Sequence, residues 1–119
     1  MPPMGNAPYR MGDGLAYIYT VLDDKSAGGK PIKPLQLYGK AYFDYLSIGS
    51  DDFQIALQEG AKIEMRIRIL QNREVGSLHV VRVSGQYYSV WRTRHTVNKH
   101  GVPVTDLTLE RTTVKYDLN

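Results

Sequence analysis

The sequence has no cysteine among its 119 residues. This absence excludes disulfide frameworks, thiolate zinc sites and cysteine nucleophiles, so packing and hydrogen bonds must provide the stability. It also suits a reducing compartment such as a cytosol. A chain of this length is typical of one domain that buries roughly two-thirds of its unfolded surface. We therefore expect a single core.

Long apolar runs are missing as well. No stretch approaches the ~20 apolar residues that a membrane helix requires. Residues 1–14 lack the hydrophobic centre of a signal peptide. We therefore expect synthesis and residence in the cytosol, with no membrane partner. The formal net charge of +3 favours polyanions only weakly and lies within what solubility explains.

The most informative pattern that is present is an alternation from Lys62 to Ile69. Residues 62, 64, 66 and 68 are charged, and the residues between them are apolar, namely Ile63, Met65, Ile67 and Ile69. Successive side chains of a strand point to opposite faces, so the pattern predicts a β-strand with one solvated face. A helix would scatter the apolar side chains around its circumference.

Other segments predict further strands. Aromatic and β-branched residues favour strands at Leu15–Leu22 and Leu35–Ile48, and the isolated Gly39 predicts a bulge or bend in the second of them. Ser84-Gly85-Gln86 predicts a tight hairpin turn. The strands expected after the alternating one are Leu78–Val83, Tyr87–Thr93 and Thr105–Tyr116.

One helix is expected before the alternating strand. Ser50 is expected to cap it, Asp51 and Asp52 suit the positive end of its dipole, and Gly60 is expected to end it. Its predicted apolar stripe consists of Phe53, Ala56 and Leu57.

These elements predict a mainly β fold, a small β-barrel or sandwich of bent strands with one short α-helix between the second and third strands. Residues 1–14, with three prolines and three glycines, are expected to form a flexible N-terminal arm. Residues 15–116 are expected to form a single β-barrel domain, and residues 117–119 a short C-terminal tail.

The order of elements and several collinear stretches carry a resemblance to a known family. The stretches are Y-G-K-A-Y-F-D-Y-L, S-D-D-F-Q-I-A-L-Q-E-G, A-K-I-E-M-R-I-R-I, the hairpin V-V-R-V-S-G-Q-Y-Y-S-V and the strand D-L-T-L-E-R. From about Leu15 to Thr113 the chain resembles the head-tail joining proteins of long-tailed bacteriophages, also called head-closure, stopper or head-tail adaptor proteins. It departs from the family pattern in its proline- and glycine-rich arm and in residues 71–77, which lack an aspartate-containing turn.

The resemblance implies a structural virion component at the head-tail interface, assembled in the cytoplasm of the host bacterium. Copies of the protein would form a ring beneath the portal or adaptor protein. The ring would continue the DNA channel, and possible gating of that channel is part of the same expectation. Its other partners would be a tail-completion or tail-terminator protein and, non-specifically, the packaged double-stranded DNA.

The resemblance also implies roles for particular segments. Residues of about 47–61 correspond to the segment with which family members are thought to close the channel. The residues expected to close the channel or form the ring interface are Ser50, Asp51, Asp52, Phe53, Gln54 and Gln58. Tyr9 and Arg10 are expected to make contacts of the arm. Lys62, Arg66 and Arg68 are expected to face DNA, although such a row is also typical of a solvated strand face.

Motifs for catalysis and metal binding are weak. His79, His95 and His100 lack the spacing of a zinc site. The adjacent aspartates at 23–24 and 51–52 diverge in direction, which favours loop solvation and helix capping over acid-base catalysis. The glycine-rich stretches lack the other residues of a phosphate loop. We therefore expect no enzyme, and no catalytic, metal or cofactor site.

The alternative function is a small barrel that binds single-stranded nucleic acid. Aromatic residues alternate with arginines between residues 82 and 94, and such surfaces combine base stacking with phosphate contacts. The residues concerned are Tyr87, Tyr88, Trp91, Arg82, Arg92 and Arg94. Strand alternation places Tyr87 and Trp91 on one face and Tyr88 on the other, so part of this set must lie in the core. The chain has only two phenylalanines, so tyrosine is expected to fill the core.

Overall fold

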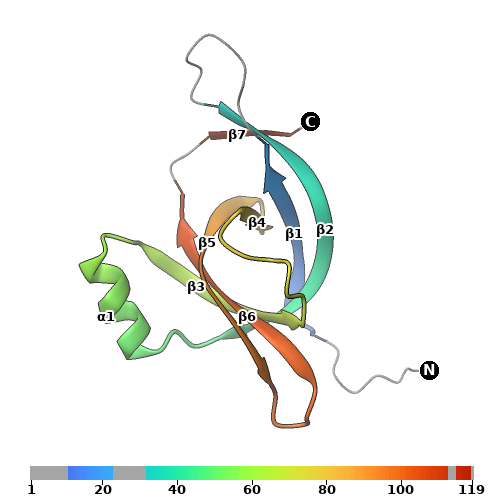
Figure 1. Cartoon of the computed structure of the whole chain (residues 1–119), viewed down its shortest axis with the longest axis vertical. Coiled ribbons are helices and arrows are strands. Elements are labelled where there is room, and N and C mark those ends of the chain that lie inside the picture. The colour runs from blue at the N-terminus through green and yellow to red at the C-terminus, as the bar shows by residue number, and fades with distance from the viewer. Residues whose placement is uncertain (1–10, 23–31, 113–114, 119) are drawn as a thin grey trace, which may run out of the picture.

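The computed structural model describes residues 11–22, 32–112 and 115–118 (Figure 1). Tyr9 and Arg10, the predicted arm contacts, lie outside the described residues. The elements follow in the order β1 (Gly14–Val21), β2 (Ile32–Leu46), α1 (Ser50–Gln58), β3 (Ile63–Leu70), β4 (His79–Val83), β5 (Gln86–Val97), β6 (Pro103–Arg111) and β7 (Lys115–Leu118).

The sheet closes because β1 pairs along both of its edges. It is antiparallel to β4 on one side and to β2 on the other, so the order β1-β4-β5-β6-β3-β2 returns to β1. The long strand β2 bends around one side of the resulting ring of six antiparallel strands (Figure 1). The predicted fold class is confirmed: the protein is mainly β, barrel-like, and has one short helix between the second and third strands.

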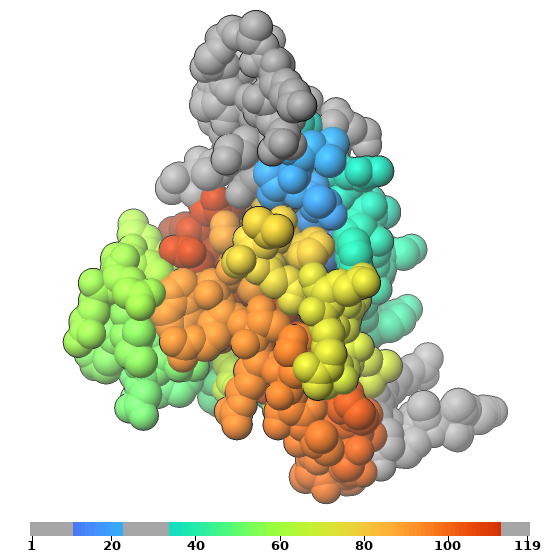
Figure 2. Space-filling model, viewed as in Figure 1, coloured from blue at the N-terminus to red at the C-terminus, as the bar shows by residue number. Residues whose placement is uncertain are grey.

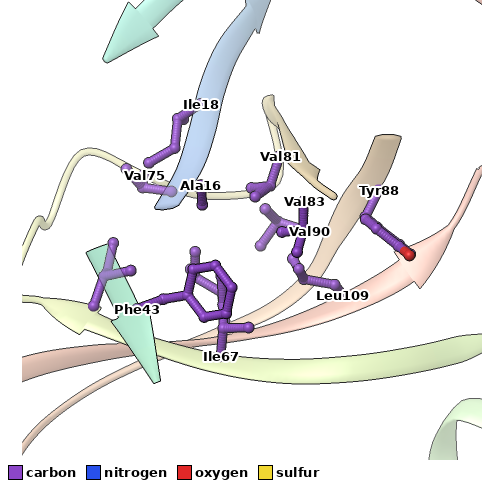
Figure 3. Close-up of a cluster of buried hydrophobic side chains, with 12 residues drawn as sticks. Ala16, Ile18, Phe43, Ile67, Val75, Val81, Val83, Tyr88, Val90 and Leu109 are labelled. Carbon is purple, nitrogen blue, oxygen red and sulfur yellow. The ribbon is translucent and has the colours of Figure 1, made fainter. Parts of the chain in front are cut away.

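The core lies inside this ring. Ile67 and Ile69 of the alternating strand β3 are buried, while Arg66 and Arg68 lie on the outer face, as the alternation predicts. All six strands contribute to one buried cluster (Figure 3), whose members are Ala16, Ile18, Phe43, Ile67, Ile69, Val75, Val81, Val83, Tyr88, Val90, Leu107 and Leu109. Full burial of each large aliphatic or aromatic side chain stabilises the fold by about 1.5–3 kcal/mol.

A loop closes one end of the barrel. Residues 71–77, predicted to be a turn or excursion between strands, carry Val75, which is 2% exposed and packs in the core cluster (Figure 3). The loop is held by Tyr38, whose hydroxyl donates to Oε1 of Glu74 at 2.6 Å. Val75 therefore ties the loop to the core, although Arg73, Glu74 and Ser77 are exposed.

The bend in β2 coincides with a bulge. Ile18 of β1 pairs with Gly39, but its neighbour Tyr19 pairs with Leu37, so Tyr38 is an extra residue on β2. An extra residue bends a strand and increases its twist. The bulge or bend predicted at Gly39 is therefore confirmed within one residue.

Two predicted boundaries differ from the structure. The expected closing strand Thr105–Tyr116 is two strands, because β6 ends at Arg111 and β7 instead runs parallel to residues 32–35 of β2. The expected arm of residues 1–14 is also shorter at its C-terminal end. Met11 is buried, and the Asp13 amide donates to the carbonyl oxygen of Phe43 at 2.9 Å. Burial of the Met11 side chain holds this part of the segment on the barrel.

The β4–β5 hairpin has the tight turn that Ser84-Gly85 predicts. Both residues have positive φ, 52° at Ser84 and 81° at Gly85, as a type I′ turn requires. Glycine tolerates this conformation, whereas a Cβ at a positive φ costs about 1–2 kcal/mol.

Replacing Gly85 with alanine should lower the free energy of unfolding by about 1–2 kcal/mol, because alanine pays that steric cost in the folded state. Urea denaturation measures the change. Gly76→Ala is the matched control, since Gly76 has no positive φ and open space at its Cβ position, and it should change stability by less than about 0.5 kcal/mol. Equal losses in the two variants would contradict this account of the turn.

Candidate functional site

A backbone carbonyl caps the N-terminal end of helix α1, and a glycine terminates its C-terminal end. Gly49 is the N-cap residue, and its carbonyl accepts the Phe53 amide at 3.0 Å. The prediction that Ser50 caps the helix is wrong, because Ser50 is the first helical residue and no side chain caps this end. The predicted end is confirmed: Gly60 has a φ of 78°, and the Ala61 amide donates to the carbonyl of Ala56 at 2.8 Å.

The helix is fastened to the barrel by Trp91 and Arg92. The pairing of β5 with β6 shifts between Val90 and Arg92, and Trp91 at this bulge packs against a small cluster beneath α1. That cluster consists of Ala56, Ala61, Ile63 and the partly buried Ile48. The Trp91 indole N–H donates to Oε1 of Glu59 at 3.3 Å, and Arg92 donates to Oδ1 of Asp52 at 2.6 Å. The Arg92 guanidinium also lies 4.5 Å from the centre of the Trp91 ring.

The larger apolar side chains of α1 are not part of the buried cluster beneath the helix. Phe53 and Leu57 are 42% and 56% exposed, and Ile55 is also exposed, whereas Ala56 is buried. Two members of the predicted inward stripe, Phe53 and Leu57, are thus on the outside. We call Phe53 and Leu57, which lie one turn apart on the same side of α1, the helix face. The helix α1 forms a lobe at one side of the molecule (green in Figure 2).

The other residues expected to close the channel or form the ring interface share this lobe. Asp52 is half-buried by its ion pair with Arg92. Exposed polar side chains cover the rest of the helix, namely Ser50, Asp51, Gln54 and Gln58. The structure therefore brings this predicted set together on one protruding element.

A second exposed apolar surface lies on the opposite side of the barrel, where β2 bends (Figure 1). Tyr42 is 64% exposed, and Tyr38 and Leu70 are exposed as well. These three side chains line one cavity between β2 and the end of β3. We call them the β2 face. Sequence analysis missed this surface, because β2 and β3 separate there and a strand pattern does not reveal where two strands diverge.

The predicted DNA-facing arginines are engaged by a buried carboxylate. Asp106 on β6 is 2% exposed and lies beside Arg68 in the β3–β6 ladder. Its oxygens accept hydrogen bonds from Nε and Nη2 of Arg68 at 2.7 and 3.0 Å, and from Nη2 of Arg66 at 3.1 Å. Hydrogen bonding to Asp106 raises the pKa of Arg68 above its ordinary value. Of the three predicted residues, only Lys62 is exposed.

The aromatic residues considered for single-strand nucleic-acid binding pack against other side chains of the protein. Tyr88 lies in the core cluster, and burial raises the pKa of its hydroxyl. Trp91 packs beneath α1. Tyr87 packs against Tyr19, with the ring centres 6.0 Å apart, as part of a second small cluster. The expectation that tyrosine fills core positions is therefore confirmed for Tyr88.

The histidines occupy separate places. His79 Nδ1 accepts the Gly76 amide at 3.2 Å, its ring meets Tyr38 edge-on, and burial lowers its pKa. His95 Nδ1 shares a hydrogen bond of 2.9 Å with the Thr105 hydroxyl. Within residues 11–22, 32–112 and 115–118, no three His, Asp or Glu side chains gather at a possible metal position. In the same residues, no helix has the length and apolar character to cross a membrane.

Comparison with known proteins adds no assignment. No family model matches the chain, and a comparison with curated proteins finds no significant match.

Removing the Asp106 charge should destabilise the barrel. In Asp106→Asn, two guanidinium groups lose the carboxylate that accepts their hydrogen bonds, so we expect the free energy of unfolding to fall by roughly 2–4 kcal/mol. Thermal and urea denaturation measure the loss. Lys62→Ala, which changes an exposed charge at the start of the same strand, should stay within about 0.5 kcal/mol of the wild type. An Asp106→Asn variant as stable as the wild type would mean that solvent screening leaves the ion pairs of Asp106 with Arg66 and Arg68 without a net contribution to stability.

Replacing Trp91 with alanine should loosen α1 before the barrel. The indole is the largest side chain of the cluster beneath the helix, so amide exchange of residues 53–60 should accelerate by about tenfold or more. Hydrogen exchange followed by mass spectrometry measures this effect peptide by peptide. Tyr42→Ala, an exposed aromatic residue away from the helix, should leave exchange in α1 unchanged. Uniform acceleration throughout the barrel would show that α1 is no independent unit.

Proposed function

We propose that the protein is a structural virion component of a long-tailed bacteriophage, a ring-forming subunit of the head-tail connector. In this proposal it forms the head-closure ring beneath the portal or adaptor and continues the DNA channel toward the tail. The observation that carries the proposal is the presence of two separate exposed apolar surfaces, the helix face and the β2 face, on opposite sides of one small barrel (Figure 1).

Ring symmetry explains why two surfaces are needed. In a ring each subunit meets identical neighbours on its two sides, so one chain must carry two different, complementary patches. Phe53 and Leu57 stay exposed to water, whereas Ala56 is the buried residue of α1, and neighbouring exposed apolar side chains mark an interaction surface. The fastening of α1 by Trp91 and Arg92 supports the same interpretation, because it fixes the direction in which the helix face points.

The ends of the barrel suit contacts along the ring axis. The β5–β6 hairpin projects from one end of the long axis (Figure 1), and Val97 near its tip is exposed. The turn is ordered by Asn98, whose side chain accepts the amides of His100 and Val102. A rigid projection of this kind supports docking on a preceding or following ring, such as the portal adaptor or a tail-completion protein.

The alternative of single-strand nucleic-acid binding has less support. It needs free aromatic rings beside free cations, but Trp91 and Tyr88 are packed. Of the arginines in this set, Arg92 is paired with Asp52 and Arg82 lies over the Tyr87 ring. Lys62 remains exposed, which is compatible with weak contacts to packaged double-stranded DNA.

Oligomer formation tests the proposal. Native mass spectrometry and electron microscopy of the full chain, alone and with the portal and adaptor encoded near its gene, should detect rings of defined subunit number. The double substitution Phe53→Ser and Leu57→Ser should weaken assembly by about 100-fold, since each exposed side chain loses roughly 1–2 kcal/mol of burial in the interface. Its melting temperature should fall only slightly, because neither side chain belongs to a buried cluster of the monomer.

Leu78→Ser is the matched control. Leu78 is 78% exposed but belongs to neither apolar surface, so assembly should be unaffected. A chain that stays monomeric on every template, or that binds short single strands tightly with a steep salt dependence, would contradict the connector proposal. Flanking portal, capsid and tail genes would support it.

A further inference from the structure

The loop of residues 71–77 joins β3 to β4 and is held on the barrel by contacts at both of its ends. Val75 is its buried side chain, while Arg73, Glu74 and Ser77 are exposed. Opening of the loop removes one apolar side chain from the core and leaves the paired strands in place. Local opening of this kind costs less free energy than unfolding of the whole barrel. The contacts that close the loop therefore decide how often Val75 leaves the core.

His79, the first residue of β4, closes the C-terminal end of the loop on Gly76. The backbone amide of His79 donates to the Gly76 carbonyl at 3.0 Å, and the ring Nδ1 of His79 accepts the Gly76 amide at 3.2 Å. A ring nitrogen that accepts a hydrogen bond carries no proton. The closed loop therefore requires the neutral imidazole, with its proton on Nε2.

The surroundings of the His79 ring also favour its neutral form. The ring is half-buried and meets Tyr38 edge-on, with 4.9 Å between the ring centres. Burial lowers the pKa of His79 below its ordinary value and outweighs the Gly76 backbone and the Glu74 carboxylate, which act in the opposite direction. That carboxylate is already engaged, because its Oε1 accepts the Tyr38 hydroxyl at 2.6 Å. A move of Glu74 toward a protonated ring would break this second contact of the loop.

Glu74 is the one charged group beside the His79 ring among the residues that the structure describes. On one side of β4, β1 places Thr20 opposite His79, and threonine does not titrate. On the other side, the pairing of β4 with β5 begins only at Val80. The loop supplies Glu74, and β2 supplies the Tyr38 ring. A change of charge on the imidazole is therefore felt mainly within the loop itself.

We propose that His79 is a pH switch for the loop of residues 71–77, in which protonation of Nδ1 releases Gly76 and lets Val75 leave the core. A protonated Nδ1 is a donor that faces the N–H donor of Gly76, so their hydrogen bond is lost. In the open loop the ring is hydrated and takes up the proton at its ordinary pKa of about 6.5. Because the open form binds the proton more tightly, the closed form is favoured at higher pH and loses stability as the pH falls below that value.

The switch acts on the cavity of the β2 face. Tyr38 and Asn72 line this cavity, and the Tyr38 hydroxyl is held by Glu74. The Asn72 side chain in turn accepts the Glu74 amide at 3.0 Å. Opening of the loop therefore frees the Tyr38 ring and widens the cavity on its side. The switch itself is a property of the single chain, and only its effect on assembly rests on the proposed connector function.

Amide hydrogen exchange of the full chain, followed by NMR, tests the switch at about pH 7.5 and about pH 5.5, a range in which histidine is the side chain that ordinarily titrates. Protection factors remove the pH dependence of the exchange chemistry. In the wild type, protection of the amides of residues 75–77 should fall by about three- to tenfold at the lower pH, the upper bound being the protonated fraction of a hydrated imidazole. Residues 105–109 of the core strand β6 should keep their protection.

Two matched variants locate the titrating group. His79→Asn places an amide oxygen, which accepts the Gly76 amide at any pH, where Nδ1 lies, so its protection should change by less than about twofold. His100→Asn removes an exposed imidazole on the β5–β6 turn and should retain the wild-type response. In the wild type, the His79 ring resonances should also titrate at lower pH than those of the urea-unfolded chain.

Several results would overturn the inference. Protection that is the same at both pH values, or a loss that persists in His79→Asn, excludes His79 as the switch. A response that disappears in His95→Gln instead would assign it to the other end of the loop, where Thr105 contacts both His95 and the Asn72 amide. Equal losses in β6 would indicate acid destabilisation of the whole barrel. Ring formation, which tests the connector function, is measured separately and decides none of these outcomes.

Discussion

The pairing of β1 with both β2 and β4 is the constraint on which the rest of the structure depends. It closes the sheet into a ring of strands and turns one face of every strand inward. Once closed, the barrel is filled by its own side chains, with Ile67, Leu107 and Leu109 fully buried. Any surface for a partner must then come from outward residues, from α1 or from places where neighbouring strands separate.

Two departures from regular pairing create the outer surfaces. The bulge in β5 leaves Arg92 on the outer side together with Trp91, and the two side chains hold α1. The separation of β2 from β3 beyond Asp44 and Arg68 opens the cavity lined by the β2 face. Barrels commonly place bulges and strand separations at their binding regions. In this protein the bulge in β5 and the separation of β2 from β3 lie in one closed sheet, so the helix face and the β2 face are held at fixed positions relative to each other.

Local patterns predicted most of the fold, because period-two alternation and turn residues act over a few positions. The strand at Lys62–Ile69, the Ser84-Gly85 turn and the helix end at Gly60 followed from such signals. The helix face did not, since Phe53 and Leu57 have the spacing of a buried stripe, and the side of α1 that is covered is set by contacts with Trp91 and Arg92 from a distant strand. Likewise, Arg66 and Arg68 carry no local sign of their pairing with Asp106, which lies about 40 residues later.

In the connector that we propose, the burial of Val75 inside the barrel restricts where DNA can pass. Val75 and the other aliphatic and aromatic side chains of the core cluster fill the interior of the barrel, so no channel runs through a single subunit (Figure 3). A passage wide enough for a duplex must therefore lie on a symmetry axis, between subunits, with the outsides of several barrels as its lining. The aperture is then set by subunit number and tilt, so small rotations of rigid barrels would widen or narrow it without any change in their interiors.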